Sequence, residues 1–329
     1  MYLVTGATGL IGSYICRNLL RQGHAIRALR RKSSSMALVE DIQDHIEWVE
    51  GDLLDVAALY SHTEGIEGIV HSAAFISYNS RDEGMMQKVN VEGTANMVNV
   101  ALAREVNYFL HISSVAAVGK QRSQQLIDET HKLNPTDDLT GYARSKWLSE
   151  MEVWRGISEG LPAAIVNPSL VLGPGELNRS STQIFKYIQE QRRFYTSGVV
   201  NYVDVRDVAE VARKIMDAGL TGERYILSAG SATYKQLFDK VAQALDKRPP
   251  NIKVGVPLIK WVSALDQART FLTKQPPLVS NELAQVAKNT HTYSSKKVEE
   301  ALKIQFRSLE ETVRWCGKEL SKKMEKLPV

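Results

Sequence analysis

Three glycines near the start of the chain, Gly6, Gly9 and Gly12, constrain the fold more than any other feature. They follow a short apolar run at residues 2–4 and precede apolar residues in helical spacing that begin at Ile15. This order predicts a strand, a tight turn and a helix. In such a unit the backbone N–H groups of the turn and the helix N-terminus face an anionic group, usually a pyrophosphate. The glycines serve the turn, the close approach of the backbone to that group, and the packing of helix on strand.

The first half of the chain alternates strand-like apolar segments with helical ones. Strands are predicted at residues 2–5, 25–29, 46–50, 68–72, 108–113 and 163–168, and helices at 12–22, 56–63, 85–104 and 142–159. This alternation predicts a parallel sheet with helices on both faces. Right-handed crossovers then give a doubly wound α/β sheet of the Rossmann type, with ligands at the carboxyl ends of the strands.

A second motif, Tyr142-Ala143-Arg144-Ser145-Lys146, lies in one of the predicted helices. Tyr142 and Lys146 are four positions apart, so their side chains project from one face of that helix. A phenol has an ordinary pKa of about 10. A nearby ammonium group favours the phenolate and lowers this pKa toward neutrality, where the phenol can act as a general acid or base. Together with the glycine turn, the pair indicates dinucleotide-dependent chemistry.

With these two motifs the chain resembles the short-chain dehydrogenases/reductases, specifically their extended and atypical branch, the NAD-dependent epimerase/dehydratase family. Within that branch its pattern is most similar to dihydroflavonol-reductase-like proteins. The branch also contains nucleotide-sugar epimerases and dehydratases, and hydroxysteroid dehydrogenases. The resemblance runs over nearly the whole chain. Its further matching segments are Gly51-Asp52-Leu53, His71-Ser72-Ala73-Ala74, Asn90-Val91-Glu92-Gly93-Thr94, Ser113-Ser114, Asn167-Pro168-Ser169, Gly173-Pro174-Gly175 and 202–209.

The resemblance implies an active site with four catalytic residues. Tyr142 would be the general acid in reduction and the general base in oxidation, while Lys146 would bind the nicotinamide ribose and lower the pKa of Tyr142. Ser114 would donate a hydrogen bond to the substrate carbonyl oxygen; Ser113 competes for this role, but the family alignment favours Ser114. Asn90 would shape the site or relay protons, with a structural role in its helix as the alternative.

The resemblance also implies a nicotinamide dinucleotide cofactor. Its expected contacts are Gly6, Thr8, Gly9, Leu10, Ile11, Gly12, Asp52, Leu53, Ala73, Ala74, Pro168 and Ser169, with Tyr142 and Lys146. An NAD site of this type has an acidic residue about 20 positions after the glycines. Arg30 stands there instead, followed by Arg31 and Ser33. A guanidinium cannot accept the ribose hydroxyls but matches a 2′-phosphate, so we expect NADP(H), with NAD and a plain surface cluster as alternatives.

The pattern of the chain changes after residue 168. A helix is predicted at about 182–191, residues 202–207 and a helix at 208–218 resemble the first half again, and an amphipathic helix at 234–245 precedes further helices. In the family such segments form a smaller, substrate-binding lobe. We therefore expect a Rossmann domain of residues 1–168 plus about 200–227. The smaller, discontinuous, mainly helical lobe would take about 169–199 plus 228–329.

Three functions are compatible with the sequence. The first is NADPH-dependent reduction of a ketone or aldehyde, and the second is a nucleotide-sugar epimerase or dehydratase. Sugar-nucleotide members often carry a diphosphate-binding arginine where this chain has Val200, although Arg179, Arg192 and Arg193 could substitute. The third is a non-catalytic dinucleotide sensor, since a fold does not fix a function. Such sensors commonly lack the tyrosine and lysine, and the presence of both here argues against this alternative.

Composition sets wider limits on partners and location. A net charge of +4 suits an anionic cofactor or substrate without indicating nucleic-acid binding. No apolar run reaches the roughly 18 residues that a membrane span needs. The first strand begins at once, leaving no room for a cleavable signal, so we expect a cytoplasmic protein with a small-molecule substrate and no nucleic-acid or membrane partner. Oligomeric state is open, with a homodimer through helices 85–104 and 142–159 as one alternative.

No cluster of His, Cys, Asp or Glu has the spacing of a metal site. His71 and His111 lie in apolar strands, and we expect both to be hydrogen-bonded core histidines. Aromatic residues that could line a substrate pocket, about half of them in contact with substrate, are Phe75, Tyr78, Phe185, Tyr187, Phe194 and Tyr195.

Overall fold

The computed structural model describes residues 1–77, 79–119, 126–134, 139–177, 179, 181–255 and 290–325. The elements of the first half are β1 (Tyr2–Thr5), α1 (Leu10–Arg21), β2 (Ile26–Arg30), β3 (Glu47–Glu50), α2 (Val56–His62), β4 (Gly68–His71), α3 (Glu83–Met86), α4 (Gly93–Ala103), β5 (Tyr108–Ile112), α5 (Gly141–Ser158) and β7 (Ala163–Pro168). The predicted elements are confirmed with ends that shift by up to two residues. One difference is internal: the helix predicted at 85–104 contains a π-helical turn, η3 (Gln87–Glu92), between α3 and α4.

The main sheet is parallel, which confirms the doubly wound prediction. In the described part of the chain it has seven strands in the order β11-β7-β5-β4-β1-β2-β3. Strand β1 lies between β2 and β4: the chain first builds β2 and β3 on one side of β1 and then crosses to β4 on the other side. At such a switch point the loops after β1 and β4 diverge and open a crevice at the carboxyl edge of the sheet, where doubly wound proteins bind ligands.

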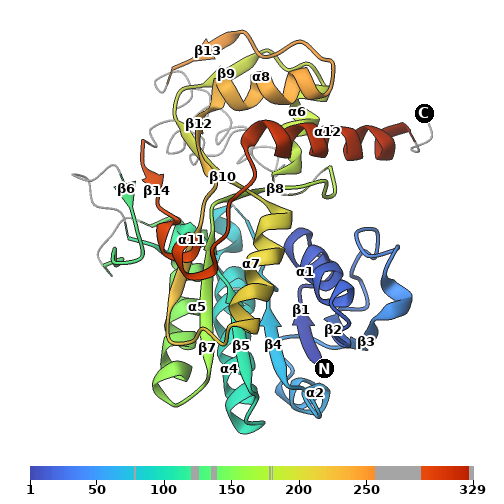
Figure 1. Cartoon of the computed structure of the whole chain (residues 1–329), viewed down its shortest axis with the longest axis vertical. Coiled ribbons are helices and arrows are strands. Elements are labelled where there is room, and N and C mark those ends of the chain that lie inside the picture. The colour runs from blue at the N-terminus through green and yellow to red at the C-terminus, as the bar shows by residue number, and fades with distance from the viewer. Residues whose placement is uncertain are drawn as a thin grey trace.

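Two helical layers cover the main sheet, as the alternation of side chains along its strands requires. Val4 faces the core beneath α1 and α7 (Val205–Asp217), which lie on one face. Its neighbour Leu3 faces the opposite core, beneath α2, α4 and α5. Figure 1 shows these layers in the lower part of the molecule, with α5 and α4 flanking the strands and α1 beside α7.

The segment at residues 202–207 does not rejoin the main sheet, contrary to the resemblance noted in its sequence. It forms β10 (Val199–Asp204), the middle strand of a second sheet between β8 (Leu170–Leu172) and β12 (Gly230–Thr233). The edge position beside β7 is taken by β11 (Arg224–Leu227), which the sequence analysis missed. The physical reason is that β10 is buried on both sides: Val203 packs in the core under α7, and Val200 in the core of the second sheet. Its sequence, which is apolar apart from Asn201 and Asp204, therefore looks like a strand of a parallel sheet.

The second sheet carries its own helices, α6 (Thr182–Gln189), α8 (Tyr234–Ala244) and α12 (Leu309–Glu325). Their apolar faces meet in a core built around Phe185, Leu237 and Leu320. Two short pairs and one helix complete the described elements: β9 (Phe194–Thr196) with β13 (Ile252–Val254), β6 (Leu126–Ile127) with β14 (Thr292–Tyr293), and α11 (Lys296–Leu302). The part expected to be mainly helical thus contains strands as well, and it lies above the main sheet in Figure 1.

Candidate active site

The glycine turn lies between β1 and α1, at the switch point of the sheet. Gly6 has a φ of +69°, and a Cβ atom there would lie 2.7 Å from the backbone nitrogen of Ala73. A Cβ atom on Gly12 would lie 2.2 Å from the carbonyl oxygen of Gly6. Only glycine fits either position. At Gly6 the chain after β4 lies against the glycine turn, and at Gly12 the start of α1 packs on the same glycine turn.

The N-terminus of α1 is open to an anion. Gly9 is the N-cap residue, and no side chain caps the helix. The first turn also holds no acidic residue. Free N–H groups at a helix N-terminus, next to a turn that accepts no Cβ, fit the pyrophosphate of a dinucleotide. Thr8, Leu10 and Ile11 belong to this same turn, so all the predicted phosphate contacts lie together.

The residues predicted for the adenosine end follow β2 and β3. The Arg30 guanidinium donates to Glu50 Oε1 at 3.0 Å, which ties the two strand ends together. Arg31 and Ser33 are exposed just beyond Arg30. Asp52 accepts from the Leu54 backbone N–H at 3.0 Å. Leu53, also predicted here, is buried against Gly93 of α4. A basic cluster therefore stands at the end of β2, with one of its two arginines in an ion pair.

The residues predicted for the nicotinamide half follow β4 and β7. The Ala73 N–H donates to Thr5 Oγ1 at 3.2 Å, and Ala74 is exposed beside it. Pro168 ends β7 and precedes Ser169, whose buried hydroxyl has no hydrogen-bond partner among the described residues. An unpaired buried hydroxyl is costly and calls for an explanation. A carboxamide or other polar group of a bound cofactor would satisfy it.

The tyrosine and lysine of the second motif lie in the first turns of α5. Thr140 caps this helix, its side chain accepting from the Ala143 N–H, so Tyr142 is held in the first turn. Lys146 is buried and its Nζ donates to the carbonyl oxygen of Ile112 at 2.9 Å. Ile112 ends β5, and Ser114 follows two residues later as the N-cap of a short 3-10 turn, η4 (Val115–Ala117). The structure therefore brings Tyr142, Lys146 and Ser114 to the carboxyl edge of β5.

Burial controls the charge of Lys146. It lowers the pKa of the ammonium from its ordinary value to about 8, while the carboxylate of Glu150 acts in the opposite direction. The ammonium is thus still present near neutral pH. Of the two candidate serines, Ser113 is buried beside Glu150 and only Ser114 is partly exposed, which agrees with the preference for Ser114.

The π-helical turn places Asn90 between the strands and α5. Its Oδ1 accepts from the Phe75 N–H at 2.7 Å, and its Nδ2 donates to the Phe75 carbonyl at 2.9 Å and to Ser145 Oγ at 2.9 Å. Asn90 therefore fixes the chain that follows β4 and also contacts the catalytic helix between Tyr142 and Lys146. The sequence left a relay role and a structural role open; these contacts are structural, and π-turns of this kind are frequent at functional sites.

A buried chain of hydrogen bonds joins the glycine turn to Asn90. Thr5 Oγ1 lies 2.8 Å from His71 Nδ1, His71 Nε2 lies 3.0 Å from Thr94 Oγ1, and Thr94 donates to the Asn90 carbonyl at 2.5 Å. Since the Thr94 hydroxyl proton is used on Asn90, His71 must donate from Nε2 and accept at Nδ1 from Thr5. The sequence analysis gave neither threonine a role. Both stand in segments that it had singled out, since Thr5 precedes Gly6 and Thr94 ends the segment that begins at Asn90.

The two core histidines differ. Burial, together with the charge of Lys146, lowers the pKa of His71 to about 3, so its ring is neutral and hydrogen-bonded as expected. His111 stacks on it at 5.4 Å between ring centroids, but neither of its ring nitrogens has a partner among the described residues. The expectation of a hydrogen-bonded core histidine is therefore wrong for His111, because its sheet neighbour His71 uses both ring nitrogens on Thr5 and Thr94. Burial lowers the pKa of His111 well below its usual range.

No group of three or more potential metal ligands occurs among the described residues. Within the same ranges, no helix has both the length and the apolar character needed to cross a bilayer. Of the aromatic residues proposed for a substrate pocket, Phe185 is instead fully buried in the core of the second sheet, and Tyr187 stacks on Phe238. Phe194 is exposed, and Tyr78 lies outside the described residues.

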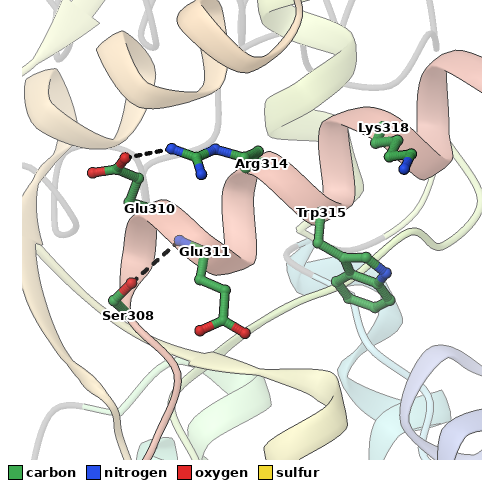
Figure 2. A pocket seen from close by; sticks show the side chains of 6 residues that line it. All are labelled: Ser308, Glu310, Glu311, Arg314, Trp315 and Lys318. Atoms are coloured by element: carbon green, nitrogen blue, oxygen red, sulfur yellow. Dashed lines mark hydrogen bonds and ion pairs between the residues drawn. The ribbon is translucent and has the colours of Figure 1, made fainter.

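A shallow surface pocket lies along α12, apart from the predicted site residues. Figure 2 shows its lining, Ser308, Glu310, Glu311, Arg314, Trp315 and Lys318, which come from the start and middle of this one helix. Arg314 pairs with Glu310 at 2.6 Å, and Ser308 Oγ accepts from the Glu311 N–H at 3.2 Å. Because Glu310 pairs with Arg314 inside the pocket and Glu311 pairs with Arg307 outside it, the pocket shows no set of groups that converge on a ligand.

The strand order, the glycine turn and the placement of Tyr142 and Lys146 define a dinucleotide-binding protein of the short-chain dehydrogenase/reductase type. Residues 2–228 match the NAD dependent epimerase/dehydratase family, and the chain belongs to this family. It is therefore an enzyme of the extended branch, which confirms the resemblance found in the sequence.

The relatives with curated names include reductases. The chain is 31% identical over 279 residues to "Sterol demethylase protein B" of Methylococcus capsulatus, covering 84% of each chain. It is 30% identical over 309 residues to "Putative dihydroflavonol 4-reductase" of Synechocystis sp., covering 91% of this chain and 88% of the relative. Among solved structures, that of gox2253 is 30% identical with a TM-score of 0.85 and covers 100% of this chain and 99% of its own. The structure of UDP-glucose 4-epimerase of Thermotoga maritima shares the fold, with a TM-score of 0.80. It is 19% identical and covers 98% of this chain and 99% of its own.

Proposed function

We propose that this protein reduces a ketone or aldehyde carbonyl with NADPH. The observation that carries the proposal is that α5, whose first turns hold Tyr142 and Lys146, bonds through Lys146 to Ile112 at the carboxyl end of β5, two residues before Ser114. The reductases among its relatives support this class of reaction, dihydroflavonol 4-reductase and cinnamoyl-CoA reductase among them.

In this mechanism the protein orients the carbonyl and supplies the proton. A nicotinamide dinucleotide held at the glycine turn would supply the hydride for the carbonyl carbon. Ser114 donates a hydrogen bond to the carbonyl oxygen, where negative charge develops. Tyr142 transfers its phenolic proton to the same oxygen, which completes the alcohol. The Lys146 ammonium stabilises the resulting phenolate and also binds the nicotinamide ribose.

The basic cluster after β2 supports NADPH as the cofactor. A 2′-phosphate at this place would accept charge-assisted hydrogen bonds from Arg30 and Arg31. It would compete with Glu50 for the Arg30 guanidinium, since that pair is exposed and inexpensive to break.

Within the described ranges, the three arginines that could bind a nucleotide-sugar diphosphate, Arg179, Arg192 and Arg193, are exposed. Val200 is buried in the core of the second sheet. Arg179 is exposed and pairs with Glu176 at 3.2 Å, and Arg192 is exposed and pairs with Glu190 at 2.9 Å. These arginines do not replace a diphosphate ligand next to Tyr142 in the described structure. The Tyr142 and Lys146 pair likewise argues against a non-catalytic sensor.

The test is NADPH oxidation against a panel of dihydroflavonols, aromatic aldehydes, cinnamoyl-CoA and sterol ketones. With the best substrate, Tyr142→Phe removes the transferable proton and is expected to lower kcat by about 10²- to 10⁴-fold while leaving NADPH affinity unchanged. Tyr60→Phe, on the exposed face of α2, is the matched control and should behave as the native protein.

Three results would refute the proposal. Turnover of Tyr142→Phe close to that of the native protein would remove the assigned acid. Binding of NADPH without oxidation by any carbonyl in the panel would favour the sensor alternative, and conversion of a nucleotide sugar without net NADPH consumption would favour an epimerase.

A further inference from the structure

Glu150 is a buried carboxyl group that the proposed mechanism does not use. It lies one helical turn after Lys146 on the same face of α5, and its side chain is fully buried. Burying a carboxylate costs several kcal/mol unless charges and hydrogen bonds compensate it. Its partners therefore indicate what the group does.

One partner connects Glu150 to the backbone of the proposed oxyanion residue. Asn167, on β7, donates from Nδ2 to Glu150 Oε1 at 2.5 Å. The same Nδ2 donates to the carbonyl oxygen of Ser114 at 2.9 Å. The carboxylate fixes the orientation of the amide, and the amide fixes the start of η4, where Ser114 is the N-cap. Glu150 thus acts on Ser114 through one intervening side chain.

Several neighbouring groups oppose the effect of burial on Glu150. Arg224 of β11 lies 3.4 Å from Oε2. Burial raises the pKa of Glu150, and Arg224, Ser113, Asn167 and Lys146 each act to lower it. Because the guanidinium keeps its proton at any relevant pH, a buried Arg224 requires this carboxylate as its counter-charge.

Lys146 faces few other charges. His71 of β4 and His111 of β5 lie near it, but burial keeps both rings neutral at neutral pH. Tyr142 lies one turn before it on α5. Among the described residues, Glu150 is the one carboxylate whose charge raises the pKa of the Lys146 ammonium.

We propose that Glu150 is a positioning residue for the active site, which provides the buried counter-charge of Lys146 and, through Asn167, anchors Ser114. The proposal rests on the proposed function for its catalytic consequence. A purely structural role, joining β11 to α5, is the competing explanation. Buried ion pairs often stabilise a fold no better than apolar side chains of the same size, so stability alone does not account for this one.

The first experiment compares Glu150→Gln with Glu152→Gln. Glutamine keeps an acceptor for Asn167 but removes the charge, so the Lys146 ammonium should lose its proton at a lower pH. We expect the alkaline limb of the kcat profile to move down by about one pH unit, with a larger loss of kcat above pH 8 than near pH 6 and little change in the KM for NADPH. Glu152 pairs with Arg155 at 2.9 Å on the surface of the same helix, and its variant should leave the profile unchanged.

A second variant guards against misfolding of the first. Glu150→Met combined with Arg224→Met removes both charges together, so neither is left buried alone, and a pair replaced in this way commonly keeps its fold. It should show the same downward movement of the alkaline limb. Native kcat and a native limb in both folded variants would overturn the proposal.

A measurement without substrate separates this proposal from the proposed function. In protein labelled with ¹³C at the lysine ε-carbons, the Lys146 signal, assigned with Lys146→Arg, should titrate near pH 8 in the native protein and lower in Glu150→Gln. If that signal moves but no carbonyl is reduced, the proposed function fails and the role of Glu150 as counter-charge stands. If the signal does not move, the role of Glu150 is refuted even where the enzyme is an active reductase.

Discussion

At the scale of single residues, the cofactor preference depends on Arg30. In the structure this guanidinium is held by Glu50, a pair on the exposed side of the strand ends. Exposed pairs contribute little free energy, about 0 to 1 kcal/mol, whereas hydrogen bonds from a guanidinium to a phosphate contribute about 1.5 to 3 kcal/mol. The difference in free energy favours a change of partner for the Arg30 guanidinium, from the Glu50 carboxylate to a 2′-phosphate.

We therefore predict opposite effects from the two partners. Arg30→Asp should raise the Kd for NADPH by about 10- to 100-fold and leave that for NADH nearly unchanged, because only NADPH carries the 2′-phosphate. Glu50→Gln should tighten NADPH binding by up to about fivefold. Fluorescence titration of each variant with NADPH and with NADH measures these Kd values. The control is Glu47→Gln, which breaks the similar pair with Arg27 at the other end of β3; equal losses for NADPH and NADH in Arg30→Asp would contradict the prediction.

At the scale of elements, the start of α5 determines where Tyr142 lies. Thr140 caps α5, and Thr233 caps α8 in a reciprocal arrangement with Gln236. Loss of either cap should cost about 1 kcal/mol of stability. Tyr142 is in the first turn of α5, so fraying of that end moves the phenol as well.

Thr140→Ala and Thr233→Ala should thus lower the free energy of unfolding by similar amounts, while only Thr140→Ala lowers kcat. Thr140→Ser, which keeps the hydroxyl, should restore both properties. Urea unfolding and steady-state kinetics on the three variants provide the measurement. An equal loss of kcat in Thr233→Ala would mean that stability, and not the position of Tyr142, limits turnover.

The paired histidines in β4 and β5 predict a loss of stability in acid. The folded protein holds both rings neutral because their pKa values lie far below the ordinary value of about 6.5. Above pH 6.5 neither state binds the protons, so stability is complete. As pH falls below 6.5 the unfolded chain takes them up first, and each histidine should cost about 1.4 kcal/mol per pH unit.

Replacing His111 by Leu should remove one of these two contributions. The free energy of unfolding, measured in urea between pH 7.5 and 5.5, should then fall less steeply than in the native protein. His45→Gln, at an exposed histidine, is the control and should leave the slope unchanged. Glu150, whose raised pKa acts in the opposite direction, is present in all three proteins and cancels in the comparison. Identical slopes in the native protein and His111→Leu would refute this account.

At the scale of the whole molecule, a cofactor that binds only the folded chain stabilises all of it. At a concentration of 100 times Kd the stabilisation should be about 2.7 kcal/mol. The Tm should accordingly rise with NADPH, and at the same concentration rise less with NADH. The measurement is a thermal melt with each dinucleotide; Arg30→Asp should lose the difference between them. A difference that persists in this variant would place the 2′-phosphate elsewhere.

The main sheet could be predicted from the sequence because its signals are local. The glycine turn and the strand–helix alternation each lie within a few tens of residues, and the elements they predict are confirmed. The strand β11 was missed because residues 202–207 look like the strand that returns to the sheet, whereas the pairing of Arg224–Leu227 with β7 is visible only in the folded chain. The roles of Tyr142, Lys146 and Ser114 stay predictions, although the structure brings all three to one edge. Partners such as Thr5, Thr94 and Asn167 could not be found in the same way, since a buried hydrogen bond needs neighbours that only the folded chain supplies.

The late position of β11 in the chain has a consequence for biosynthesis. When the ribosome has released residues 1–168, six parallel strands are available but β7 is still an open edge with unpaired backbone groups. The chain must first be extended through β8 and β10 of the second sheet before Arg224–Leu227 can cover it. Exposed edges of this kind promote association between chains. A nascent or truncated product that ends before this strand should therefore depend on chaperones and aggregate without them.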